Sequence, residues 1–142
     1  MPVMTADELM VFLAREFPQA AKEGVSIDHL DDTTIRLSLP TQDQHLRPGG
    51  TVSGPTLVWF ADVGFYLLIL AQLGPVALAV TTSLNINFMR KPEVGVLKGE
   101  GRLMKLGRTL AVGDFTIWSD GQKAPVAHVT MTYSIPPKKS QV

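Results

Sequence analysis

Residues 55–73 read PTLVWFADVGFYLLILAQL and form the most apolar stretch of the chain. The strongly polar side chains in this stretch are Asp62, in its middle, and Gln72, near its end. A run of this length that is apolar on every side predicts a helix buried in a protein core. Burying an unpaired carboxylate is costly, and carboxylates kept in such places are often functional, so Asp62 is our first candidate site residue.

A transmembrane helix is the alternative interpretation, because a bilayer is spanned by about 20 apolar residues. Asp62 and Gly64 interrupt the run at its centre, and the sequence after it alternates between apolar and polar residues as a sheet does. These features favour a buried core helix, and we expect no membrane span.

The composition sets limits on the possible functions. A chain of 142 residues is the usual size of one domain, and we expect a single domain over 1–142, with an N-terminal helix within 1–20 and a tail from 136 to 142. Thirteen basic and thirteen acidic residues give a formal net charge of zero, so no overall field draws the protein to nucleic acid or to an anionic membrane. The chain has no cysteine, which excludes disulfides and thiol catalysis. The N-terminus lacks the pattern of a secretory signal, so the cytoplasm is the expected compartment.

The segments around the apolar run predict an antiparallel sheet. Four predicted strands follow it, at 77–90, 94–105, 109–119 and 124–135, and turn sequences at 91–95, 106–108 and 119–121 separate them. Upstream, 25–30 and 33–39 predict a hairpin. Before the hairpin, 5–17 predicts an amphipathic helix with a Thr5/Glu8 capping box. The apolar face of that helix comprises Leu9, Met10, Leu13 and Phe17.

This order of elements predicts an α+β fold. One curved antiparallel sheet wrapped around one long apolar helix, with an additional N-terminal helix, accounts for the order economically.

The residues before the apolar run predict how its helix begins. Residues 47–55 read RPGGTVSGP, and Ser53 and Gly54 followed by Pro55 are typical of a helix start. Backbone N–H groups at a helix start have no partner within the helix, so those of Gly54 and Thr56 could stabilise an oxyanion. A simple helix cap is the alternative.

These motifs resemble those of PaaI-like acyl-CoA thioesterases of the hotdog fold, over about residues 25–135. The family pattern is Asn-x-x-Gly-x-x-His-Gly-Gly, with an acid nine residues after the histidine. Gly50, Gly54 and Asp62 match the pattern, whereas Arg47, Ser53 and Pro55 stand in place of its Asn, His and last Gly. Segments 81–92 (TTSLNINFMRKP) and 105–111 (KLGRTLA) resemble strands of the family.

The resemblance implies hydrolysis of an acyl-CoA without a metal or cofactor, in a homodimer or a dimer of dimers. Asp62 would be the nucleophile or general base, the Gly54 N–H the oxyanion donor, and Thr81 a contact of the acid or its water. Gly54 and Asp62 are about 12 Å apart along one helix, so a reacting carbonyl between them needs a second copy of the helix. For Asp62 the alternative is a structural role.

Other functions of the same fold are a non-hydrolytic acyl-thioester binding protein and a dehydratase. The first would fit a chain that lacks the family's Asn and His. The second would need a histidine near the acid, and the helix and its loop contain none.

The remaining candidates are substrate-binding residues. Ser53, which has a hydroxyl group where the family has an imidazole, is one of these candidates. The resemblance also implies that basic groups near the site receive the phosphates of coenzyme A, and the basic candidates are Arg47, Arg90, Lys91 and Arg108. Arg47 could instead hold an acidic acyl group, and all these charges could simply be solvated. Tyr66, one helical turn after Asp62, could bond to it or pack in the core.

The three histidines, His29, His45 and His128, show no metal-binding spacing, so we predict no metal site and no cofactor. His45 precedes the loop and could lie near the site, but we expect a solvated loop histidine.

Overall fold

The computed structural model describes residues 1–76 and 78–137. Its elements in chain order are α1 (Ala6–Glu16), α2 (Pro18–Ala21), β1 (Ser26–Leu30), β2 (Thr34–Pro40), the 3₁₀ turn η1 (Asp43–His45), β3 (Leu46–Arg47), β4 (Thr51–Val52), α3 (Gly54–Leu73), β5 (Val80–Phe88), β6 (Val96–Leu106), β7 (Leu110–Ser119) and β8 (Ala127–Ser134).

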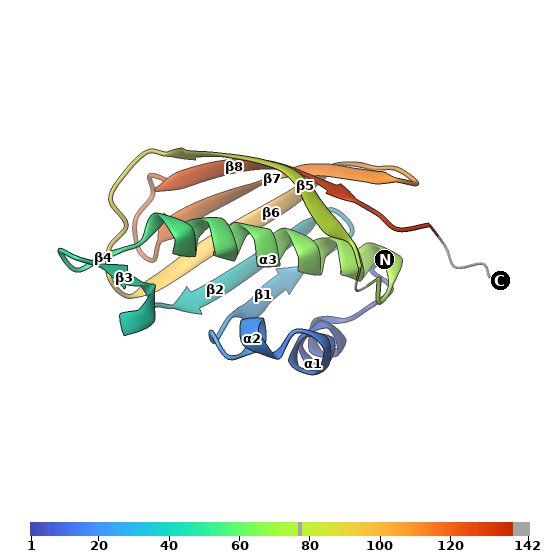
Figure 1. The fold of residues 1–142 in the computed structure, drawn as a ribbon, viewed down its shortest axis with the longest axis horizontal. Helices are drawn as coiled ribbons and strands as arrows, with labels where there is room; N and C mark the ends of the chain where they lie inside the picture. Colours follow the sequence, from blue (N-terminus) through green and yellow to red (C-terminus); the bar gives the residue numbers. More distant parts are fainter. Residues whose placement is uncertain (77, 138–142) are drawn as a thin grey trace.

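The main sheet has six antiparallel strands in the order β1-β2-β6-β7-β8-β5. It curves around α3, which lies along its concave face, while α1 and α2 lie beside β1 (Figure 1). The predicted arrangement of a curved antiparallel sheet, a central apolar helix and an N-terminal helix is therefore confirmed. β1 and β5 are the two edge strands.

The helix α1 has the predicted capping box. The Thr5 hydroxyl accepts a hydrogen bond from the Glu8 N–H, and the Glu8 side chain accepts one from the Thr5 N–H. The predicted apolar face is wrong at its end. Phe12 is buried in the core, whereas Phe17 caps the helix with a non-helical backbone and is 38% exposed. Pro18 explains the difference, because the residue before a proline avoids the helical conformation.

The helix α3 begins where the sequence predicts. Ser53 is its N-cap, and Gly74, with a φ of 97°, ends it. The helix is long and apolar enough to cross a membrane, but most of it is buried against the rest of the chain. It is the core helix of this fold.

Glycines allow α3 and the sheet to approach each other closely. A Cβ atom at Gly64 of α3 would lie 2.3 Å from the Phe115 ring and 2.6 Å from the Leu37 side chain. A Cβ atom at Gly113 would lie 2.2 Å from the Arg102 carbonyl oxygen. Phe115 is fully buried and packs edge-on against Phe60 of α3, with the ring centres 5.5 Å apart. The core therefore has no space for a side chain at these glycines.

Some local structure differs from the sequence predictions. The short elements α2, η1, β3 and β4 were not predicted, because two to four residues carry too little periodicity to be recognised. Each predicted strand overlaps an observed one. Residue 77, where the fifth strand was predicted to begin, and residues 138–142 of the predicted tail lie outside the described residues.

Gly64→Ala tests the close packing of α3. On helix propensity alone this change should stabilise the protein by up to about 1 kcal/mol. Because the new methyl group would overlap the Phe115 ring, we expect the free energy of unfolding to fall by about 1–3 kcal/mol instead. Urea unfolding of the two proteins measures the difference, and a stabilised variant would contradict the packing described above.

Candidate active site

The Asp62 carboxylate accepts hydrogen bonds from two hydroxyl groups. The Thr81 hydroxyl lies 2.5 Å from Oδ1 of Asp62, and the Tyr133 hydroxyl lies 2.7 Å from the same oxygen. The Tyr133 hydroxyl is also 2.9 Å from the Asp62 carbonyl oxygen. Lengths of about 2.5–2.7 Å are typical of hydroxyl groups that donate to an ionised carboxylate. These two hydrogen bonds therefore fix the position of Oδ1.

The strand register brings the two hydroxyl groups together. Thr81 of β5 is the cross-strand partner of Tyr133 of β8, and a bulge follows Thr81. The family resemblance implies Thr81 as a contact of the acid, whereas no motif in the sequence points to Tyr133. The alternation in β8 placed Tyr133 on the same face as Met131 and Val129, but only the pairing of β5 with β8 puts it beside Thr81.

The second carboxylate oxygen of Asp62, Oδ2, has no hydrogen-bond donor within residues 1–76 and 78–137. Asp62 lines a pocket of about 420 Å³. The other residues that line this pocket are Glu16, Phe17, Val63, Tyr66, Ala79, Val80, Thr81 and Tyr133.

Both tyrosines of the pocket hold their protons strongly. Burial raises the pKa of Tyr133, and the negative charge of Asp62 raises it further. Burial also raises the pKa of Tyr66, with a smaller contribution from the charge of Glu16. Tyr133 therefore remains a hydrogen-bond donor to Asp62 at any physiological pH. Tyr66 is buried, and its ring centre lies 6.4 Å from that of Tyr133.

At the start of α3, one of the two predicted oxyanion donors is already used. The Thr56 N–H donates to the Ser53 side chain, 3.3 Å away, so it is not available to a ligand. For the Gly54 N–H, the structure of the described residues offers no acceptor. A Cβ atom on Gly54 would lie 3.4 Å from the Phe88 ring. Gly54 therefore lies near the C-terminal end of β5, whereas Thr81 is at the N-terminal end of the same strand.

His45 is buried, only 3% exposed, which contradicts the prediction of a solvated histidine. Its Nδ1 accepts a hydrogen bond from the Gln42 N–H at 2.8 Å, and its Nε2 lies 2.6 Å from a Glu23 carboxylate oxygen. This pattern assigns the proton to Nε2. The His45 carbonyl oxygen accepts from the Ser53 N–H and the Thr56 hydroxyl, so His45 anchors the start of α3.

Ser53 shares a hollow of about 350 Å³ with His45 and Glu23. A serine, a histidine and a carboxylate are the residue types of a catalytic triad. Here both ring nitrogens of His45 already have other partners, so the histidine cannot act as a base for Ser53.

The predicted basic residues do not form one cluster within the chain. Arg90, which donates to the Pro125 carbonyl oxygen, and Lys91 follow the end of β5 that lies near Gly54. Arg108 is in the turn between β6 and β7, at the opposite end of the sheet, where Leu110 pairs with Ser134. Arg47 is exposed in the small β3–β4 hairpin.

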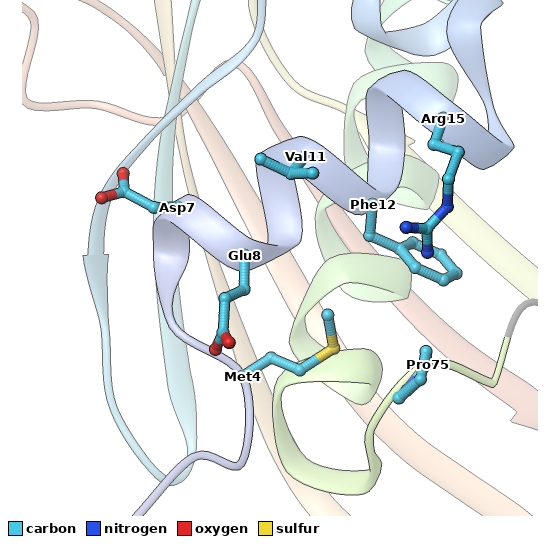
Figure 2. Close-up of a pocket in the computed structure, with 7 residues that line it drawn as sticks. All are labelled: Met4, Asp7, Glu8, Val11, Phe12, Arg15 and Pro75. Carbon is cyan, nitrogen blue, oxygen red and sulfur yellow. The ribbon is translucent and has the colours of Figure 1, made fainter.

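A further hollow lies beside α1 and the residues that follow α3, and Asp62 does not line it. Figure 2 shows the residues that line it: Met4, Asp7, Glu8, Val11, Phe12, Arg15 and Pro75. Arg15 lies over the Phe12 ring, 5.6 Å from its centre, and Glu8 is engaged in the capping box. Among the residues that the structure describes, no group of three or more His, Asp or Glu residues could hold a metal ion.

The sequence and the fold both match known proteins. A family model described as the thioesterase superfamily matches residues 49–126. The structure of a candidate thioesterase from a Silicibacter species is 55% identical in sequence, with 96% of this chain and 95% of that chain covered and a TM-score of 0.89. None of the curated proteins matches the sequence.

Two more distant structures share the fold. A variant of the phenylacetic acid degradation protein PaaI from Thermus thermophilus is 25% identical, covers 84% of this chain and 99% of that chain, and has a TM-score of 0.73. Thioesterase superfamily member 2 of zebra fish is 17% identical, covers 94% and 99%, and has a TM-score of 0.82. At 17% identity that likeness supports the fold alone.

The raised pKa of Tyr133 predicts an alkaline loss of stability. In the unfolded chain a tyrosine loses its proton near its ordinary pKa of 10.0, whereas native Tyr133 keeps it to higher pH. Above about pH 10 the unfolded state therefore binds fewer protons, and this group lowers the free energy of unfolding by about 1.4 kcal/mol per pH unit.

Tyr133→Phe should remove that contribution. We expect the stability difference between wild type and Tyr133→Phe to shrink as the pH rises from about 9 to 11, measured by guanidinium unfolding. Parallel pH profiles of the two proteins would show that Tyr133 ionises equally easily in both states.

Proposed function

The chain belongs to the thioesterase superfamily, and from that premise we propose that it hydrolyses an acyl-CoA, or a related acyl thioester, to a free acid and a thiol. The observation that carries the proposal is the Asp62 carboxylate. Two hydroxyl groups fix its Oδ1, while its Oδ2 is left open beside a pocket. We place the protein in the cytoplasm.

In this mechanism Asp62 Oδ2 acts on the thioester carbonyl carbon. It either attacks that carbon directly or takes a proton from a water molecule that attacks it. The carbon–sulfur bond then breaks, and the thiolate leaves and takes up a proton. On the water route this step gives the free acid. After direct attack the acyl group is left on Asp62 as an anhydride, which a water molecule hydrolyses to the free acid and the Asp62 carboxylate. Negative charge develops on the carbonyl oxygen, which the Gly54 N–H and the positive end of the α3 dipole stabilise. Thr81 and Tyr133 keep the carboxylate in one orientation.

We propose that the complete site forms between two copies of the chain. On α3, Val58, Trp59 and Asp62 are only partly buried, and Pro55 is exposed. Their spacing of three and four residues places them on one side of the helix, which the chain itself leaves open. Because Gly54 and Asp62 of one helix are about 12 Å apart, the Gly54 that serves one Asp62 belongs to the other copy.

The edge strand β5 supports the same dimer. It pairs with β8 on one side and is open on the other. Antiparallel pairing of two β5 strands about a two-fold axis brings the Phe88 end of one copy beside the Thr81 end of the other. The part of one copy around Gly54, which includes Arg47, Arg90 and Lys91, then lies beside the part of the other copy around Asp62, which includes Arg108. These cations would bind the phosphates of coenzyme A, and two such dimers could pair further.

Asp62→Asn tests the proposed chemistry. The change keeps the shape of the side chain and removes its charge, so we expect the rate of thioester hydrolysis to fall by about two orders of magnitude or more. Release of free thiol from a panel of acyl-CoA substrates measures the rate, and the melting temperature checks folding. Unchanged turnover in a folded variant would remove Asp62 from the mechanism. If the wild type bound acyl-CoA and hydrolysed none, it would be an acyl-thioester binding protein.

Mixing two inactive variants tests the shared site. Asp62→Asn removes the carboxylate that one copy supplies to each shared site. Gly54→Leu blocks the N–H donor that the other copy supplies. After subunit exchange, half of the dimers are mixed and half of the sites in these are intact, so activity should recover to about a quarter of wild type. If exchange is demonstrated and activity does not return, the shared site between two copies is wrong.

A further inference from the structure

We infer that the pocket beside Asp62 holds the acyl group of the substrate and that Glu16 restricts this group to acyl chains without a negative charge. This inference rests on the proposed thioester hydrolysis and adds the chemical class of the substrate. Glu16 and Phe17 belong to the N-terminal helix segment, outside the region that the family model matches.

The position of the pocket makes it the place for the acyl group. A carbonyl carbon within reach of Asp62 Oδ2 has the coenzyme on one side and the acyl group on the other. The apolar walls of the pocket, which include Val63, Val80 and the Phe17 ring, suit an acyl group better than a charged nucleotide. Phe17 is 38% exposed, and an acyl group against its ring would remove that apolar surface from water.

Among the residues that the structure describes, the charged groups that line the pocket are both negative. They are Asp62 and Glu16, and no arginine, lysine or histidine of residues 1–76 and 78–137 lines it. A carboxylate at the end of an acyl chain would therefore meet two like charges and no partner.

The ion pair of Glu16 with Arg15 weakens this effect, but Arg15 itself does not line the pocket. Arg15 donates through Nε to one Glu16 oxygen, at 3.0 Å. However, its guanidinium group lies over the Phe12 ring and lines the other hollow (Figure 2). The charge of Glu16 also contributes to the raised pKa of Tyr66, so its field reaches the pocket wall.

Two substrates of matched shape measure how strongly the pocket disfavours a negatively charged acyl chain. Glutaryl-CoA and its terminal amide have nearly the same shape and differ in one negative charge. We expect wild type to prefer the amide by at least about tenfold in kcat/KM. The Glu16 side chain is 43% exposed, so solvent screens part of its effect. Glu16→Gln should therefore raise kcat/KM for glutaryl-CoA by about three- to fivefold and leave the amide nearly unchanged. Glu16→Lys should raise it further.

Glu8→Gln is the matched control. It removes the same charge from the same helix, but Glu8 lines the other hollow, and glutamine still supports the capping box. Equal changes in Glu8→Gln and Glu16→Gln would overturn the inference, because the effect would then come from net charge alone. A wild-type preference for glutaryl-CoA, or a ratio that Glu16→Gln does not alter, would also overturn it.

Binding separates this inference from the proposed hydrolysis. Ketone analogues of the two substrates, with CH₂ in place of sulfur, cannot be hydrolysed, and calorimetry gives their Kd values. If the amide analogue binds more tightly and Glu16→Gln narrows the difference, the inference holds even for a protein that hydrolyses no thioester. If neither analogue binds, the inference is wrong, whereas the proposed hydrolysis is decided separately by the panel of acyl-CoA substrates.

Discussion

The structure depends on one constraint, which is that a twenty-residue helix with no polar face must be covered on every side. The sheet covers one side at very short distance, because glycines at positions 64, 99 and 113 remove the side chains that would keep α3 and the strands apart. The N-terminal helix covers part of the rest. The side that carries Val58, Trp59 and Asp62 is left partly open, and this is the side on which our proposal places a second copy.

The same constraint explains how a carboxylate can occupy a core helix. Asp62 lies at the border between the buried and the open side of α3, so it is only partly removed from water. Two charge-assisted hydrogen bonds, each contributing about 1.5–3 kcal/mol, are comparable with the penalty of burying one such ion. In the described part of the chain the charge is therefore stabilised by the neutral hydroxyl groups of Thr81 and Tyr133, without a cation.

Different elements contribute different parts of the proposed site. α3 supplies the carboxylate and, at its first turn, the free Gly54 N–H, and β5 and β8 supply the hydroxyl groups that orient the carboxylate. The end of α1 supplies one wall of the pocket through Glu16 and Phe17. Because that wall comes from a separate helix, its residues can change without disturbing the geometry around Asp62.

Local sequence patterns determined the parts of this protein that depend on neighbours in the chain. The apolar run fixed α3, the Ser53-Gly54-Pro55 motif fixed its start, and alternation fixed the strands, since periodicity and capping act over a few residues. The position of Asp62 on α3 followed in the same way. Its hydrogen bond to Tyr133 did not, because those residues are 71 positions apart and meet only through the pairing of β5 with β8.

The tertiary structure also decided where several residues of the site lie. Arg108 lies at the opposite end of the sheet from Arg90 and Lys91. His45 is buried, and Phe17 lines the pocket beside Asp62 instead of lying in the core. Each outcome depends on strand order or on how one element ends against another. Such contacts are selected by the packing of the whole chain, because residues close in space but distant in sequence leave no local pattern to read.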